Sequence, residues 1–332
     1  MSNKLFKKHI VTFLKLGIAI LVILYLFKSG RLTKEALIRL FKVDSIPFII
    51  ASALFFLGSQ MLSAVRLGYL LKTINFPIRF SETFKFVMIG NFFNMVIPGV
   101  FGGDFVKAFY LVKNEKNSKG RSSGIVVIDR ILGLLAILFI GGLAIVYLLQ
   151  QNNVYLTPHL KEIYLISVII CSFFCIFAAY IFLGGNQQVR EKLKQIFAPI
   201  LRKSFFCHIA GGLGAPAKNW KVLLCSFLIS LPIQLMALTG LLILINILPG
   251  FRPNLFSLFS VSAVVMLLSV IPVTPGNLGW TELIASFGWS AVGSKAGAEI
   301  FFYWRIVILL CSVPLGLLYF LQLRTLKRCQ NR

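Results

Sequence analysis

Charged residues are scarce in this sequence, and long stretches have none at all. Only 13% of the 332 residues are charged, whereas a soluble domain carries roughly 25%. The runs without any Asp, Glu, Lys or Arg are 45–65, 131–160, 163–189, 222–251 and 253–281. A helix needs about 20 apolar residues to cross a bilayer. The sequence therefore predicts an all-α, polytopic integral membrane protein.

Acidic residues are rarer still. The chain has 10 acidic and 34 basic residues, which gives a net charge of +24. In a soluble protein, this excess of basic residues would indicate that the protein binds nucleic acid. Here the basic residues lie in loops beside apolar runs, where they anchor the chain and attract anionic lipid headgroups. We therefore expect membrane lipids as partners and no nucleic acid.

The residues that build metal and catalytic centres are also few. Three scattered histidines and six cysteines without a CxxC spacing predict no metal site, no cofactor and no catalytic residues. No Walker-type motif is present, so transport would be facilitated or driven by an ion gradient. The longest hydrophilic stretch, 184–221, is too short for an independent soluble domain. Residues 1–332 are thus expected to form a single integral membrane domain.

The apolar runs give a coarse helix map. Crossings are expected near 10–27, 46–65, 124–149, 163–183, 222–248, 255–272 and 306–323. Two shorter apolar segments lie near 86–101 and 283–293. We therefore expect about 7–9 membrane segments, two of them broken or re-entrant.

Loop charges predict the orientation of these helices. The blocks 105–123 and 184–221 and the C-terminal tail are rich in Lys and Arg and are expected in the cytoplasm, whereas 150–162 and 249–254 are nearly neutral and are expected outside. The loop 28–44 is also basic and breaks this rule if the first two helices both span.

Two Pro/Gly breaks far apart in the chain resemble each other. Residues 98–104 read PGVFGGD and residues 275–282 read PGNLGWTE. Each copy has the pattern P-G-x-(Phe/Leu)-G followed by an acid, Asp104 or Glu282. The pair predicts repeat halves of about 45–183 and 221–323, related as an inverted repeat.

Such breaks free backbone groups, which cost several kcal/mol each in hydrocarbon unless protein or water satisfies them. Corresponding breaks in two halves therefore indicate a transport cavity, with helix N-termini available to a phosphate. The alternative is a tight turn joining two ordinary helices, with the acid as an N-cap. On the cavity hypothesis, the candidate substrate-binding residues are Asn91, Asn94, Pro98, Gly99, Gly102, Gly103, Asp104, Lys107, Asp129, Arg130, Thr274, Pro275, Gly276, Gly279 and Glu282.

Other charges lie near the ends of apolar runs. Arg66 and Arg305 are expected to be interface anchors. The pair Asp129-Arg130 is either part of the site or two snorkelling interfacial residues. A carboxylate beside a broken helix is costly without a partner, so Asp104 and Glu282 should each have one.

Four segments carry a resemblance to a known family. They are Arg66 with the Leu-rich stretch after it, 91–104, Ile128-Asp129-Arg130 with Gly133, and 271–282. In these segments the chain resembles the lysylphosphatidylglycerol synthase transmembrane-region, or flippase-like, family, which also forms the membrane half of multiple peptide resistance factor proteins. The resemblance covers about residues 10–325.

The resemblance implies a multi-pass protein of a bacterial or archaeal inner membrane that moves a modified lipid between leaflets. The soluble synthase domain of the two-domain members is not expected in this chain. The residues then predict translocation of an anionic or aminoacylated lipid. Lys107 and Arg130 would bind its phosphate, and the carboxylates of Asp104 and Glu282 would carry protons. Alternatives are a membrane-embedded transferase and a scaffold for a separately encoded lipid-modifying enzyme.

Overall fold

The structure is a computed structural model of the chain. It describes residues 21, 24–30, 32–76, 78–96, 102–114, 121–150, 220–248, 254–269 and 273–330. The described residues form α-helices and short 3-10 turns, and no strand occurs among them. The all-helical prediction is confirmed.

Among the described residues, four helices are long and apolar enough to cross a membrane. They are α3 (Ile46–Lys72), α6 (Arg121–Gln150), α10 (Trp220–Ile243) and α13 (Gly297–Gln330). They confirm the helices expected at 46–65, 124–149, 222–248 and 306–323. The expected crossing at 163–183 and most of that at 10–27 lie outside the described residues.

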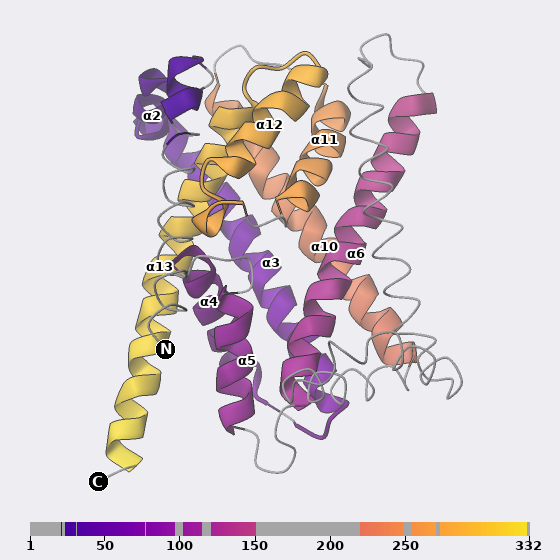
Figure 1. Cartoon of the computed structure of the whole chain (residues 1–332), viewed down its shortest axis with the longest axis vertical. Coiled ribbons are helices and arrows are strands. Elements are labelled where there is room, and N and C mark those ends of the chain that lie inside the picture. Colours follow the sequence, from indigo (N-terminus) through magenta and orange to yellow (C-terminus); the bar gives the residue numbers. More distant parts are fainter. Residues whose placement is uncertain are drawn as a thin grey trace, which may run out of the picture.

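Two helical hairpins lie between the long helices. The first joins α4 (Phe80–Val96) to α5 (Gly102–Asn114), and the second joins α11 (Leu255–Leu268) to α12 (Trp280–Ala291). A helix rises about 1.5 Å per residue, so none of these four spans a hydrocarbon core of about 30 Å. Figure 1 shows the two hairpins in opposite halves of the molecule, with the C-terminal end of α4 near mid-height. The stretch expected to cross at 255–272 is thus the first leg of a half-depth hairpin.

Local sequence explains both hairpin tips. Helix α4 ends at Val96, and Pro98 follows two residues later. Proline disfavours helical geometry in the residue before it, so the sequence favours the end of a helix at this point. In the second tip, η3 (Pro275–Asn277) contains left-handed backbone, with φ of 58° at Gly276 and 54° at Asn277. Only glycine, and to a lesser degree asparagine, adopts this region readily.

The short helix α2 (Lys34–Leu40) caps one end of the bundle. Thr33 accepts a hydrogen bond from Ala36 N at its N-terminus, and Tyr303 Oη on α13 donates to the Ala36 oxygen at 2.8 Å. The helix and the following turn η1 (Val43–Ser45) lie at the end opposite the C-terminus (Figure 1). The basic loop 28–44 is therefore at the far end from the tail predicted to be cytoplasmic.

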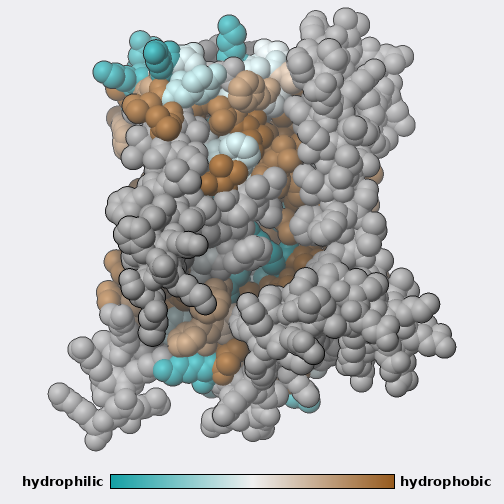
Figure 2. All heavy atoms as spheres, viewed as in Figure 1, coloured by the Kyte–Doolittle hydropathy of each residue, from teal (hydrophilic) through white to brown (hydrophobic). Residues whose placement is uncertain are grey.

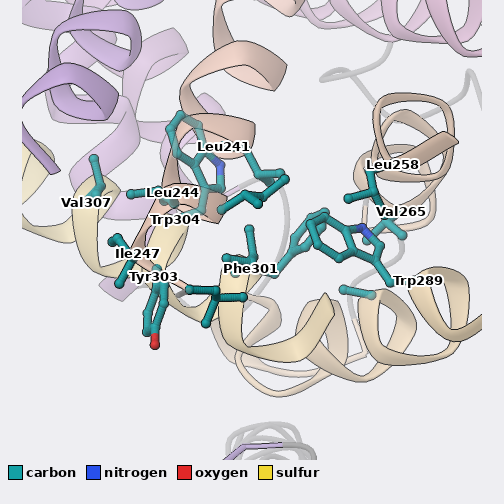
Figure 3. Close-up of a cluster of buried hydrophobic side chains, with 14 of the residues drawn as sticks. Leu241, Leu244, Ile247, Leu258, Val265, Trp289, Phe301, Tyr303, Trp304 and Val307 are labelled. Carbon is teal, nitrogen blue, oxygen red and sulfur yellow. The ribbon is translucent and has the colours of Figure 1, made fainter. Parts of the chain in front are cut away.

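A large apolar core supports the second hairpin. Side chains of α10, α11, α12, α13 and the turn η2 (Leu244–Ile247) converge around Trp289 and Phe301 (Figure 3). These two rings meet edge to face at 6.3 Å, and the Trp289 indole nitrogen donates to Ser262 Oγ at 3.1 Å. The core fixes α12 against α13 and so positions the acid and the arginine that these two helices carry.

Candidate functional site

The two hairpin tips meet inside the molecule. A methyl group placed on Gly276 would lie 3.3 Å from the Met95 backbone oxygen at the end of α4. Both tips also line one cavity of about 370 Å³, to which Asn94, Gly276 and Asn277 contribute. The end of α4, just before the first break, therefore lies against the second break and beside the same cavity. Residues 97–101 of the first break lie outside the described residues, so the role of the two breaks in substrate binding stays a prediction.

Polar side chains organise the first tip. Asn94 Oδ1 accepts a hydrogen bond from Gly103 N at 2.8 Å. This N–H group, at the N-terminus of α5, is therefore not available to a substrate. Asn91 Nδ2 donates to Gln60 Oε1 on α3 at 2.7 Å. A methyl group on Gly103 would lie only 1.8 Å from the Gly90 oxygen, so the hairpin legs touch backbone to backbone. Pro98 and Gly99 lie outside the described residues.

A buried charge cluster lies beside this tip. Arg66 Nε on α3 contacts Asp129 Oδ1 on α6 at 2.8 Å, and Arg66 Nη1 donates to Ser230 Oγ on α10 at 2.6 Å. Lys107 Nζ lies 3.5 Å from Asp104 Oδ1 and 3.9 Å from Asp129 Oδ2. The side chains of Arg66 and Asp129 are each 6% exposed. Charges buried this deeply persist because they are paired.

Arg130 is the least restrained member of the cluster. Its Nε is 3.7 Å from Asp104 Oδ2, and neither of these buried atoms makes a hydrogen bond. Its side chain is 37% exposed, compared with 9% for Lys107. Arg130 is therefore the most exposed cation of the cluster, and it lines both cavities of this region.

Arg305 on α13 organises the second tip. Its Nη1 and Nη2 donate to the Gly276 and Asn277 oxygens at 2.8 Å each, and its Nε donates to Glu282 Oε1. These are backbone oxygens that the break leaves without helical partners. Thr274 Oγ1 donates to the Leu278 oxygen at 2.8 Å.

Neither acid acts as the N-cap that the turn hypothesis required. Helix α12 has Gly279 as its N-cap, and Glu282 lies in the first turn. Asp104 likewise lies inside the first turn of α5. Both carboxylates have a cationic partner, as the sequence predicted.

A second cavity of about 270 Å³ contains the charge cluster, with Arg66, Asp104, Lys107 and Asp129 in its lining. It shares with the first cavity the residues Gln60, Asn91, Asn94, Arg130, Ala237 and Met266. Figure 2 shows hydrophilic residues at mid-height between hydrophobic ones. The two cavities therefore adjoin each other, and Arg130 lines both.

Comparison with known proteins assigns the family. The model of the family described as Lysylphosphatidylglycerol synthase TM region matches residues 12–326. The chain belongs to the lysylphosphatidylglycerol synthase TM region family. This match covers all the residues of the site described above.

Relatives of this family member include two archaeal proteins named as UPF0104 membrane proteins. That of Methanocaldococcus jannaschii is 24% identical over 324 residues, which cover 90% of this chain and 92% of the relative. That of Pyrococcus horikoshii is 32% identical over 131 residues, which cover 39% of this chain and 38% of the relative. No solved structure matches the chain.

Most candidate residues of this family member lie around the two cavities. Asn91, Asn94, Asp104, Lys107, Asp129, Arg130 and Gly276 line them. Gly102 and Gly103 begin α5, Pro275 begins η3, and Thr274, Gly279 and Glu282 support the second tip. Their role in binding a substrate stays a prediction.

Two predictions about charged residues were wrong. Arg66 and Arg305 are not interface anchors, because Arg66 is buried against Asp129 and Arg305 holds the second tip. Helix α3 continues six residues beyond Arg66 to Lys72 and α13 begins at Gly297, so both arginines lie inside their helices. The apolar residues on both sides of each arginine were the signal that could have shown this.

Polar residues of the long helices were also missed. Gln60 bonds Asn91, Ser230 bonds Arg66, and Gln234 Nε2 donates to the Gly133 oxygen at 3.0 Å. Single uncharged polar residues in an apolar run carry no sequence signal that separates a cavity lining from an ordinary helix contact.

Proposed function

We propose that this chain moves the headgroup of an anionic or aminoacylated phospholipid, or of a related lipid-linked substrate, between the leaflets of a prokaryotic inner membrane. The observation that carries the proposal is the meeting of two half-depth hairpins around a charged cavity. An ionised headgroup cannot cross hydrocarbon unaided, because its desolvation costs on the order of tens of kcal/mol. Paired breaks that line a cavity are the arrangement by which transporters replace that lost hydration.

The lining suits an amphipathic substrate. Lys107 and Arg130 would hold a phosphate, and the amides of Asn91 and Asn94 would replace part of its water shell. The larger cavity adds apolar side chains, among them Phe301 and Ile308. These would accept the glycerol and the first carbons of the acyl chains.

Reconstitution in liposomes tests the proposal. Purified chain would be inserted into vesicles that carry a fluorescent phospholipid, and the fraction that a membrane-impermeant quencher reaches would be followed over time. We expect faster exchange than in empty vesicles. Rates equal to empty vesicles for several headgroups would refute translocation.

Matched variants connect the transport to the site. Arg130→Gln removes one charge from the lining of both cavities, whereas Arg79→Gln removes the same charge from an exposed position outside both cavities. We expect Arg130→Gln to slow exchange and Arg79→Gln to leave it unchanged.

The transferase and scaffold alternatives make different predictions. A transferase would yield a covalent lipid product from purified chain plus donor. A scaffold would bind a separately encoded lipid-modifying enzyme and would retain that binding in the Asp104→Asn, Glu282→Gln double variant. A translocase should lose transport in that double variant even if partner binding persists.

A further inference from the structure

We infer that the cavity selects headgroups with a net negative charge and no amine, and discriminates against zwitterionic and aminoacylated headgroups. This inference rests on the proposed function and narrows its substrate class. It follows from the balance of charges around the two cavities.

The described residues supply one more positive than negative charge to this region. The cations in the cavity linings are Arg66, Lys107, Arg130 and Arg305. The carboxylates are Asp104, Asp129 and Glu282, the last of which lies behind Arg305. A single negative charge would therefore neutralise the site.

Every carboxylate of this set already contacts a cation. Asp129 contacts both Arg66 and Lys107, Glu282 contacts Arg305, and Asp104 lies between Lys107 and Arg130. An incoming ammonium group would thus find no uncommitted carboxylate among these residues. Asp104 Oδ2 makes no hydrogen bond, but it is buried against the Arg130 guanidinium, so an ammonium group that approached it would meet this cation. Like charges in a poorly solvated site repel strongly.

The excess positive charge is most available at Arg130. Its contact with Asp104 is 3.7 Å long, and it is the most exposed side chain of the cluster. Its Nε is buried against Asp104, so a phosphodiester oxygen would accept from the terminal guanidinium nitrogens of this partly exposed side chain. Arginine is the residue best suited to such a contact, because its planar donor groups match phosphate geometry.

The larger cavity offers no alternative place for an amine. The charged residues in its described lining are Arg130 and Arg305, with no carboxylate. The ring of Trp304 packs edge to face against Phe56 at 5.9 Å, so these two rings contact each other rather than form an open aromatic cage. An amine that extends from a phosphate on Arg130 would approach a second arginine.

The test measures binding separately from transport. Purified full-length chain would be titrated in detergent with phosphatidylglycerol, phosphatidylethanolamine and lysylphosphatidylglycerol that have identical acyl chains, each in competition with a fluorescent phosphatidylglycerol. Salt of about 0.15 M limits the screening length to about 8 Å and so weakens binding to the basic surface. We expect affinity to fall in that order, by roughly tenfold from the first lipid to the last, because partly exposed charges are screened.

Three variants test whether Arg130 is responsible for the selectivity between these lipids. Arg130→Gln should remove most of the difference between the lipids, and Arg130→Glu should reverse the order in favour of lysylphosphatidylglycerol. Arg79→Gln should change nothing, since its side chain is exposed and lines neither cavity. Melting temperatures of all three variants would show that each is folded.

The outcomes separate the two proposals. Equal affinities for the three lipids, or an equal loss with Arg79→Gln, would overturn the selectivity. Selective binding without translocation in liposomes would overturn the proposed function alone. Translocation at equal rates for all three lipids would leave the proposed function and overturn the inference.

Discussion

Arg66 shows how one residue can connect three helices. It lies on α3, forms an ion pair with Asp129 on α6 and donates to Ser230 on α10. Ser230 in turn donates to the Ser226 oxygen at 2.8 Å. Arg66 Nε, Arg66 Nη1 and Ser230 Oγ each have a partner, so the cost of burying a guanidinium is offset by several interactions.

Removal of one partner should therefore be costly. We expect Arg66→Gln to lower the free energy of unfolding by about 3–5 kcal/mol, because Asp129 would lose its hydrogen-bonded partner. Unfolding in mixed micelles with rising denaturant would measure this. The double variant Arg66→Met, Asp129→Leu should recover most of the loss, since it leaves no unpaired charge. A double variant as unstable as the single one would contradict this account.

At the scale of elements, the first hairpin depends on the approach of α4 to α5. Gly103→Ala would place a methyl group 1.8 Å from the Gly90 oxygen, so α5 would have to move away from α4. We expect a loss of about 1–3 kcal/mol in stability, typical of overpacking. Gly142→Ala on α6 is the control, because nothing lies within 4 Å of a methyl group there. Equal melting temperatures for the two variants would refute the close approach.

The second tip combines an unusual backbone with a close contact, and two glycines separate these effects. Gly276 and Gly293 both have positive φ, 58° and 80°, but only Gly276 has a neighbour within 4 Å of its added methyl group. Both alanine variants should lose about 1–2 kcal/mol from left-handed strain. Only Gly276→Ala should also change translocation or lipid binding. Similar transport in both variants would show that the tip contact is not functional.

The sequence predicted the positions of the helices better than the contacts between them. Charge-free runs located α3, α6 and α10, and the two Pro/Gly breaks marked the hairpin tips, because both signals are local. Asp104 and Glu282 were expected to need cationic partners. The sequence did not identify Arg305 as the partner of Glu282, because the hydropathy of one segment does not show which helix packs beside that segment. The length of α11 was misjudged because an apolar leg of a hairpin resembles half of a crossing.

At the scale of the whole molecule, the long helices fix which loops share a side. The C-terminal ends of α3, α5 and α13 lie at one end of the bundle and α2 at the other (Figure 1). Basic residues in the loop 28–44 thus lie at the end that the positive-inside rule assigns to the outside. Anionic headgroups of the outer leaflet would be the natural contacts of these side chains.

Cysteine labelling of intact cells tests this arrangement. In a cysteine-free background, Lys113→Cys on α5 and Lys42→Cys beside α2 place exposed thiols at the two ends. We expect an impermeant maleimide to label Lys42→Cys from outside and to label Lys113→Cys only after lysis. Labelling of both positions from the same side would contradict the fold.

The contacts around the two tips differ in length. Between α13 and the second tip, hydrogen bonds of 2.8 Å join Arg305 to two backbone oxygens. Between α5 and α6, the ion contacts are 3.7 Å and 3.9 Å long. If a lateral gate lets the acyl tails stay in the bilayer, we expect it to open between α5 and α6, where the polar contacts are longer. Spin labels at Phe109 and Phe139 should move apart when phosphatidylglycerol binds, whereas labels at Phe287 and Leu310 should keep their distance; an unchanged first distance would rule out that gate.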